Sequence, residues 1–163
     1  MLETNTTNPT LTPEQKLKLL VADRPWETEP NHAEWIDEDT DYKCRIVRHD
    51  HFGHLCGYVG IPKSHPLYGK HYSDDEVENL DAHGGLTHSG EDQDDKDTWW
   101  FGFDCSHGGD LSPNMLIHML DRELPNLLNF SRNEVYRTWE YVEREVRELS
   151  AQLRMEDNLS NQI

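Results

Sequence analysis

The run Trp99-Trp100-Phe101-Gly102-Phe103 is the segment that most restricts the fold of this chain. Large aromatic side chains favour β-strands, and a run this apolar has to be covered by other parts of the protein. Successive side chains of a strand point to opposite faces. The apolar face consists of Trp99, Phe101, Phe103 and Cys105; the mixed face consists of Trp100, Gly102, Asp104 and Ser106. We therefore predict a strand over residues 98–106 that buries its apolar face in a core.

Other segments in the middle of the chain predict strands that pair with this one. Residues 42–49 and 55–61 are each strand-like and lie close together, which predicts a β-hairpin. Residues 80–88 are predicted to form a second hairpin with 98–106, joined by the polar loop 89–97. Together these segments predict an antiparallel sheet of about four strands.

Both ends of the chain predict helices. Thr12-Pro13-Glu14-Gln15 is a capping box with proline at the first helical position, and predicts a short helix over residues 13–22. Residues 26–41 are rich in Pro, Glu and Asp and are predicted to be irregular. Residues 132–155 carry an apolar stripe at helical spacing, which predicts a long helix across the sheet and also permits coiled-coil pairing in a homodimer. The stripe consists of Val135, Trp139, Val142, Val146, Leu149 and Leu153.

The length of 163 residues predicts one globular α+β domain, with the sheet packed against the long C-terminal helix and the short N-terminal helix. We expect this domain to cover residues 11–155. Residues 1–10 are rich in Asn and Thr and are expected to be a disordered tail, and residues 156–163 are expected to fray.

The charge of the chain restricts its partners. Fifteen Lys and Arg residues face 32 Asp and Glu residues, so the formal net charge is −17 and direct binding to nucleic acid is not expected. The acidic runs at 27–41 and 74–97 are typical of a solvated surface. They also permit mimicry of nucleic acid, in which carboxylates occupy the basic cleft of a host nuclease or defence complex.

Neither a signal peptide nor an apolar run of membrane-spanning length is apparent, so a cytoplasmic protein without membrane contact is expected. The cysteines Cys44, Cys56 and Cys105 are odd in number and lack CxxC spacing, which argues against a disulfide framework or a zinc ribbon. In a reducing cytosol such residues commonly serve as small core side chains.

The best candidate site lies where the two strands of the second predicted hairpin meet. His83, Gly85 and Thr87 share one face of the segment 80–88, and the pairing is expected to bring them beside the mixed face of 98–106. Trp100 would then be a stacking wall over the floor of Gly102, with backbone amides of the turn at Gly108 and the hydroxyl of Ser106 near phosphate. Such a pocket fits a nucleotide. If the ligand is anionic, the scarce cations of this region should face the pocket; if the protein is a nucleic-acid mimic, acidic neighbours should neutralise them. These cations are Arg45, Arg48, Lys63 and Lys70.

Two catalytic versions of the site are open. In the first, His83 or His107 is a general acid or base oriented by Asp104. In the second, a divalent metal ion is held by His83, Asp104, His107 and Asp110, with His49, His51 and His54 as additional ligands. The spacing matches no known zinc signature, so metal is the less favoured version. In a third interpretation, His83 bonds to Asp104 and the bond only fixes the hairpin.

Several motifs resemble those of a family of small uncharacterised proteins common in bacteriophage and prophage genomes. They are Gly57-Tyr58-Val59-Gly60-Ile61-Pro62, His65-Pro66-Leu67-Tyr68-Gly69, His83-Gly84-Gly85-Leu86-Thr87 and Trp99-Trp100-Phe101-Gly102-Phe103-Asp104-Cys105 with His107 and Asp110. The resemblance covers about residues 45–111 and continues weakly into 136–153. It implies a phage gene expressed inside a bacterial cell, where small accessory proteins often counter host defence.

The sequence thus predicts a phage counter-defence protein that recognises a small nucleotide-like immune signal and either sequesters or hydrolyses it. The alternatives are an acidic mimic that blocks a host nuclease or defence protein, and a metal-dependent phage hydrolase. The pocket chemistry fits binding at least as well as catalysis.

Overall fold

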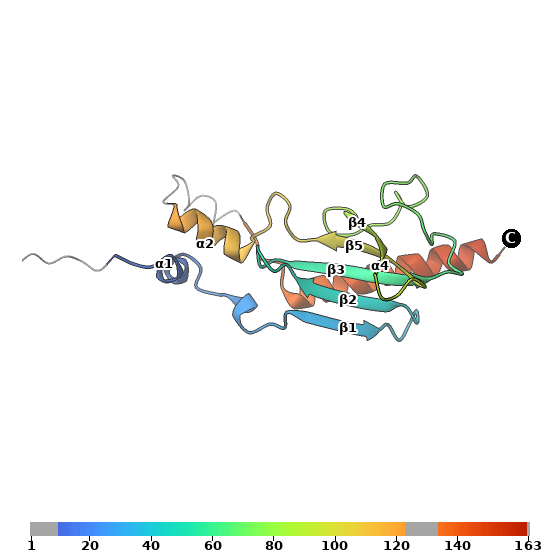
Figure 1. The fold of residues 1–163 in the computed structure, drawn as a ribbon, viewed down its shortest axis with the longest axis horizontal. Coiled ribbons are helices and arrows are strands. Elements are labelled where there is room, and N and C mark those ends of the chain that lie inside the picture. Colours follow the sequence, from blue (N-terminus) through green and yellow to red (C-terminus); the bar gives the residue numbers. More distant parts are fainter. Residues whose placement is uncertain (1–9, 123–133, 163) are drawn as a thin grey trace, which may run out of the picture.

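A computed structural model of the chain describes residues 10–122 and 134–162, and its centre is a five-stranded antiparallel sheet (Figure 1). The strand order is β1-β2-β3-β5-β4, so β3 lies in the middle and β1 and β4 form the edges. The strands are β1 (His32–Ile36), β2 (Lys43–Arg48), β3 (Leu55–Pro62), β4 (His88–Glu91) and β5 (Thr98–Asp104). The α+β architecture predicted from the sequence is confirmed.

The helices lie behind the sheet and at one end of it (Figure 1). The long helix α4 (Trp139–Ser160) packs across β2 and β3. Two shorter helices, α1 (Pro13–Leu20) and α2 (Pro113–Asp121), pack against each other beyond the sheet end, and a 3-10 turn, η1 (Pro25–Glu27), leads from α1 toward β1. No helix in the described part of the chain has an apolar stretch long enough to span a membrane.

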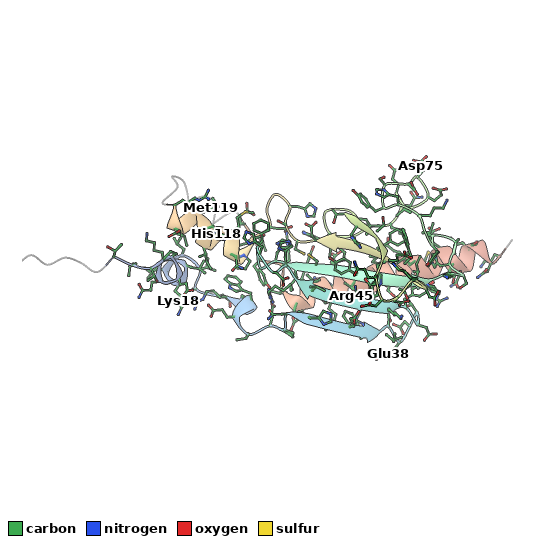
Figure 2. All side chains as sticks on the ribbon, viewed as in Figure 1. Lys18, Glu38, Arg45, Asp75, His118 and Met119 are labelled. Carbon is green, nitrogen blue, oxygen red and sulfur yellow. The ribbon has the colours of Figure 1, made fainter. Side chains whose placement is uncertain are left out.

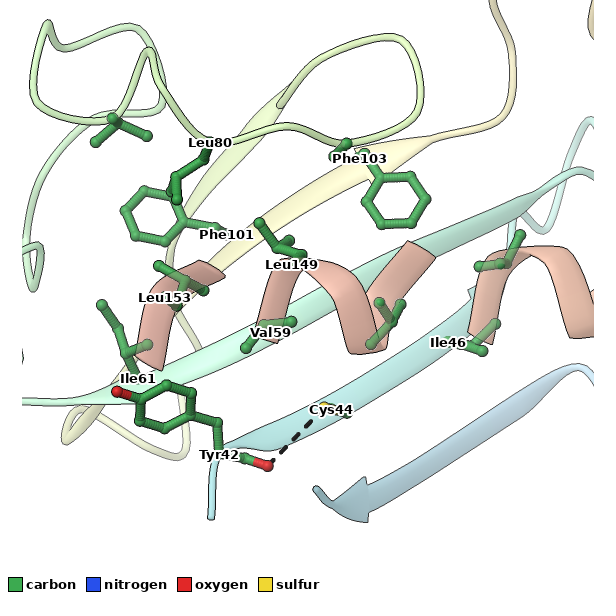
Figure 3. Packing of buried hydrophobic residues seen from close by; sticks show 14 of the residues in the cluster. Tyr42, Cys44, Ile46, Val59, Ile61, Leu80, Phe101, Phe103, Leu149 and Leu153 are labelled. Carbon is green, nitrogen blue, oxygen red and sulfur yellow. Dashed lines mark hydrogen bonds between the residues drawn. The ribbon is translucent and has the colours of Figure 1, made fainter. Parts of the chain in front are cut away.

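The main core lies between α4 and one face of the sheet. Val146, Leu149 and Leu153 of the predicted apolar stripe are buried there, so the stripe packs against the strands of its own chain. Figure 3 shows Leu149 and Leu153 on the helix and Phe101 and Phe103 on β5, within the same cluster. The predicted division of β5 into two faces is therefore correct at these positions, and Trp99 packs against the cluster while remaining partly exposed.

A smaller core joins the two short helices. It consists of Leu17, Leu111, Leu116 and Leu120. Thr12 caps α1 as the capping box predicts, because its hydroxyl accepts from the Gln15 amide and the Gln15 side chain accepts from the Thr12 amide. The second helix of this pair, α2, was not predicted from the sequence.

The face of the sheet opposite α4 is called the open face below. It carries Glu34 and Ile36 of β1, Lys43 and Arg45 of β2, Tyr58 of β3, and Trp100, Gly102 and Asp104 of β5. The loop 92–97 crosses this face from its β4 side, because Asp92 bonds to Arg45 and Asp95 bonds to Lys43.

Three predictions about the elements are wrong. Residues 26–41 are not wholly irregular, since β1 lies within them, and residues 80–87 form turns instead of a strand, because Gly84 and Gly85 adopt φ values of 68° and 84°. Helix α4 begins at Trp139 and continues to Ser160, so the fraying predicted from residue 156 is not seen up to there. Nearly all of the predicted N-terminal tail and the first two residues of the predicted helix 132–155 lie outside the described residues.

Candidate functional site

A chain of three polar side chains joins the loop after residue 82, the loop before α2 and the first turn of α4. The Nε2 atom of His83 lies 2.7 Å from Oδ2 of Asp110, and its Nδ1 atom lies 2.7 Å from the hydroxyl oxygen of Tyr141. Both ring nitrogens of His83 therefore have a partner. Because His83 bonds to Asp110, the predicted contact between His83 and Asp104 is wrong.

Asp110 is the buried centre of this cluster, with a side chain that is 1% exposed. Its Oδ1 atom accepts from Nε of Arg137 at 2.9 Å, and its Oδ2 atom also accepts from the backbone amide of His107 at 3.0 Å. Burial by itself would raise the pKa of Asp110, but the hydrogen bonds from His83, Arg137 and His107 outweigh it and hold the pKa below its usual value. Asp110 is thus an ionised carboxylate at neutral pH.

His107 has a ring nitrogen that faces two carboxylates without bonding to either. Its Nδ1 atom is buried and lacks a hydrogen-bond partner among the described residues. That atom lies 3.6 Å from Oδ1 of Asp104 and 3.6 Å from Oδ2 of Asp110. The ring lies against Gly84, where a methyl group would overlap with it, so glycine at this position lets the imidazole reach the carboxylates.

These distances are compatible with a bound metal ion. Two donors held by one ion at bond lengths of about 2.0–2.2 Å in tetrahedral geometry lie roughly 3.3–3.6 Å apart. Among the described residues, one group of potential ligands converges in this way: His83, His107 and Asp110 each offer an atom, and the three atoms lie within 4.8 Å of one another. An ion at this place would replace the His83–Asp110 hydrogen bond. The set of two imidazoles and a carboxylate fits a divalent transition metal such as zinc.

Asp104 lies beside this group and belongs to a different surface. Its Oδ2 atom accepts from the Thr87 hydroxyl at 3.0 Å, and its Oδ1 atom accepts from the Ser106 amide at 3.0 Å. These three residues line a cavity of about 460 Å³ at the end of the open face. The remaining lining residues are His49, Phe52, His54, Cys56, Tyr58, His88 and Phe103. We call this cavity the Asp104 pocket.

The Asp104 pocket contains little positive charge. No lysine or arginine is among its lining residues, and burial lowers the pKa of both His54 and His88, which favours their neutral forms. Asp104 is the one acidic residue among those that line the pocket.

Two parts of the predicted nucleotide pocket are filled by the protein's own side chains. The ring of Tyr58 lies over Gly102, where a methyl group would overlap with it. The guanidinium carbon of Arg45 lies 4.0 Å from the centre of the Trp100 ring, and Trp100 is 2% exposed. The predicted roles of Gly102 as a floor and Trp100 as a stacking wall are consequently not available in this conformation.

The predicted anion-binding cations are each paired with carboxylates (Figure 2 places Arg45 over the middle of the sheet). Arg45 bonds to Glu34 and to both oxygens of Asp92. The others pair as Arg48 with Glu29, Lys63 with Asp97 and Lys70 with Glu76. None of the four lines the Asp104 pocket. An anionic ligand was expected to have these cations facing the pocket, whereas a nucleic-acid mimic was expected to have them neutralised by acidic neighbours. The observed pairing favours the second expectation.

The remaining predicted residues lie near the site without joining the group of three. His49 and His54 stack with ring centres 4.8 Å apart, and His51 lies beside His118. Gly85 and Gly108 have open space around the position of a side chain. The ring nitrogens of His49, His51 and His54 do not belong to the group of donor atoms that converges at His83, His107 and Asp110, so their predicted role as additional metal ligands is not supported.

Sequence reasoning missed Arg137 and Tyr141. Both belong to the charged segment that was assigned to helix packing, and Tyr141 stands one residue before the buried stripe position Val142. Thr138 caps α4 and fixes the first turn that presents Tyr141, because its hydroxyl accepts from the Tyr141 amide. The available signal was an arginine and a tyrosine near the start of a helix. Their partners, Asp110 for Arg137 and His83 for Tyr141, depend on long-range packing.

Comparison with protein-family models, curated proteins and solved structures finds no match for this chain. The resemblance to phage proteins therefore stays a prediction, and the argument for function depends on the geometry of the site.

Proposed function

We propose that the protein is a metal-dependent hydrolase that holds a divalent ion between His83, His107 and Asp110. The observation that carries the proposal is the position of His107 Nδ1, a buried nitrogen without a hydrogen-bond partner among the described residues. It lies 3.6 Å from Oδ2 of Asp110, which is the separation of two ligands of one metal ion. Three protein ligands leave a position for water, as in catalytic zinc sites. The bound ion would supply an acidified water molecule.

The surrounding residues have distinct roles in this proposal. Asp104 is the general base, because it lies next to His107 and faces the Asp104 pocket, where a substrate can bind. Tyr141 and Arg137 are positioning residues, since Tyr141 fixes the orientation of the His83 ring and Arg137 fixes that of the Asp110 carboxylate.

The resemblance to phage proteins suggests a nucleotide-like immune signal as the substrate. Because the Asp104 pocket contributes no lysine or arginine, a phosphate group of the substrate would be bound by the metal ion. The aromatic and imidazole side chains of Phe52, Tyr58 and His88 offer surfaces for a ring.

Zinc titration followed by product analysis tests the proposal. The purified protein is titrated with zinc by calorimetry, then incubated with cyclic nucleotides and ADP-ribose derivatives, and the products are resolved by chromatography. We expect one zinc ion per chain and breakdown that a chelator abolishes. His107→Ala should lose zinc binding, and Asp104→Asn should keep zinc but lose turnover.

The control is His118→Ala, which removes an exposed histidine of α2 outside the group of three and should leave both properties unchanged. Failure of the wild-type protein to bind zinc would overturn the metal site. Release of intact ligand on heating would show sequestration instead of hydrolysis.

A second candidate function is mimicry of nucleic acid by the acidic surface. The observation in its favour is that Arg45, Arg48, Lys63 and Lys70 are each paired with a carboxylate, as a mimic requires. Pull-down from a bacterial lysate should then recover a DNA-binding protein in stoichiometric amount, and added DNA should release it. Recovery that DNA does not affect would contradict mimicry.

A further inference from the structure

The sheet has one edge whose backbone groups are available. In the pairing of β1 with β2, Asn31 O accepts from the Arg48 amide and the Asp37 amide donates to Tyr42 O. Hydrogen-bonded positions alternate along an antiparallel pair, so residues 31, 33, 35 and 37 face β2. The amides and carbonyls of His32, Glu34 and Ile36 consequently point away from the sheet. Figure 1 shows β1 at the margin of the molecule with no described element beyond it.

The opposite edge of the sheet has a described segment beside it. Strand β4 is covered in part by the segment around Tyr72, whose amide donates to the Ser89 hydroxyl at 3.0 Å. The contrast matters because uncovered edge strands can pair with additional strands. β1 has no such cover among the described residues.

The side chains next to the β1 edge border a cavity on the open face. Ile36 is 54% exposed, although it is a large apolar residue in a strand. It borders a cavity of about 420 Å³ on the open face, together with Glu34, Trp35, Lys43, Arg45, Asp92, Asp95 and Trp100. The indole N–H groups of Trp35 and Trp100 lack an acceptor among the described residues. A strand added to β1 would cover Ile36 and close one side of this cavity.

The charge of this surface selects the partner. Glu34, Asp92 and Asp95 contribute three carboxylates, whereas both cations in the lining, Lys43 and Arg45, are already paired with them. Only one oxygen of Glu34 bonds to Arg45, and its side chain is 48% exposed. From these observations, we propose that the β1 edge binds an extended, basic segment of a partner protein by strand addition.

A second copy of the chain is a poor occupant of the same edge. Antiparallel pairing of two β1 strands about their centre would place Glu34 of one chain opposite Glu34 of the other. Like charges directly opposite each other destabilise a strand pair, and the two chains would each carry a net charge of −17. A basic segment would instead place a positive charge opposite Glu34, and it would be attracted by the net negative charge of the chain.

The experiment uses the full chain and the capped peptide Arg-Val-Arg-Val-Arg-Val. Binding is measured by calorimetry, and amide hydrogen exchange is followed for residues 32–36. We expect saturable binding and slower exchange at His32, Glu34 and Ile36. The peptide Glu-Val-Glu-Val-Glu-Val and an N-methylated form of the basic peptide should not bind.

Two pairs of variants separate strand addition from general attraction to an acidic protein. Ile36→Pro removes an outward amide while keeping the ladder to β2, and should weaken binding about tenfold or more; Ile36→Thr keeps the amide and should not. Glu34→Lys should weaken binding, whereas Glu38→Lys, the same charge change in the β1–β2 turn (Figure 2), should have a smaller effect.

Three outcomes would overturn the proposal. They are equal binding by Ile36→Pro and Ile36→Thr, binding of the acidic peptide, and protection of the β1 amides that depends on protein concentration without any peptide. The last result would identify a second copy as the occupant.

Discussion

The hydroxyl oxygen of Tyr141 lies 2.7 Å from Nδ1 of His83, and this contact ties the first turn of α4 to the candidate metal group. Tyr141→Phe should lower zinc affinity about tenfold, because loss of a partner to the second ring nitrogen leaves the ligand imidazole less well oriented. Calorimetric zinc titration measures the change. Tyr136→Phe is the matched control, because its hydroxyl bonds to Glu29 and Arg48, and it should leave zinc affinity unchanged. Equal zinc affinities for Tyr141→Phe and wild type would remove Tyr141 from the site.

Gly102→Ala should destabilise the protein by about 1–3 kcal/mol, since the added methyl group overlaps with the Tyr58 ring. Urea unfolding measures the free energy. Gly90→Ala on the neighbouring strand β4 is the control, because the nearest atom to its new methyl group would be 3.9 Å away. The cost of Gly102→Ala should shrink in a Tyr58→Ala background. A cost that is the same in both backgrounds would mean that another neighbour is responsible.

Stability should fall as the pH is lowered from 7 to 5, in part because of His65. Burial lowers the pKa of His65, whose Nε2 lies 2.7 Å from Leu153 O and whose Nδ1 accepts from the Leu67 amide, so the neutral ring fits the folded state. The unfolded chain binds this proton more readily, with a pKa of about 6.5. The free energy of unfolding therefore decreases as pH falls below that value, by at most about 1.4 kcal/mol per pH unit for this group.

His65→Gln should reduce this slope in urea unfolding at pH 5, 6, 7 and 8. His32→Gln changes an exposed histidine of β1 and should preserve the wild-type slope. An unchanged slope in His65→Gln would show that other groups control the acid response.

Leu149→Ala should cost about 2–5 kcal/mol, because Leu149 is fully buried between α4 and the sheet. Leu159→Ala on the same helix, at a residue that is 53% exposed, should change stability by no more than about 0.5 kcal/mol. Thermal unfolding at several protein concentrations distinguishes core packing from the coiled-coil alternative. A loss of stability in Leu149→Ala that depended on protein concentration would indicate that the stripe also pairs between chains.

The parts of the fold that the sequence predicted well are those in which apolar residues recur at the regular spacing of a strand or a helix. The alternation around Phe101 and Phe103 and the stripe through Val146 and Leu149 each identify an element and its buried face. β1 was missed because its five residues lie within 26–41, where the high content of Pro, Glu and Asp indicates irregular structure. The segment 80–87 was mistaken for a strand because its alternation of residue types was given more weight than its adjacent glycines, Gly84 and Gly85, which both adopt positive φ.

The composition of the candidate site could be predicted only in part. His83, His107 and Asp110 are three of the four metal ligands considered from sequence, and the local turn already suggests that residues 107 and 110 lie close together. The pairing of His83 with Asp110 instead of Asp104 depends on how the loops pack against α4. Arg137 and Tyr141 are more than twenty residues from their partners along the chain, and a single sequence carries no information about such contacts.

The donors of the candidate metal group come from separate loops, and the residues that orient them are Tyr141 in the first turn of α4 and Arg137 just before the helix. An ion bound there would cross-link segments that are distant in sequence, so its binding free energy would be added to the stability of the folded chain. Zinc should then raise the melting temperature increasingly as its free concentration exceeds the dissociation constant, and unwinding of the first turn of α4 should weaken zinc binding. Docking of the helix and binding of the ion would therefore stabilise each other.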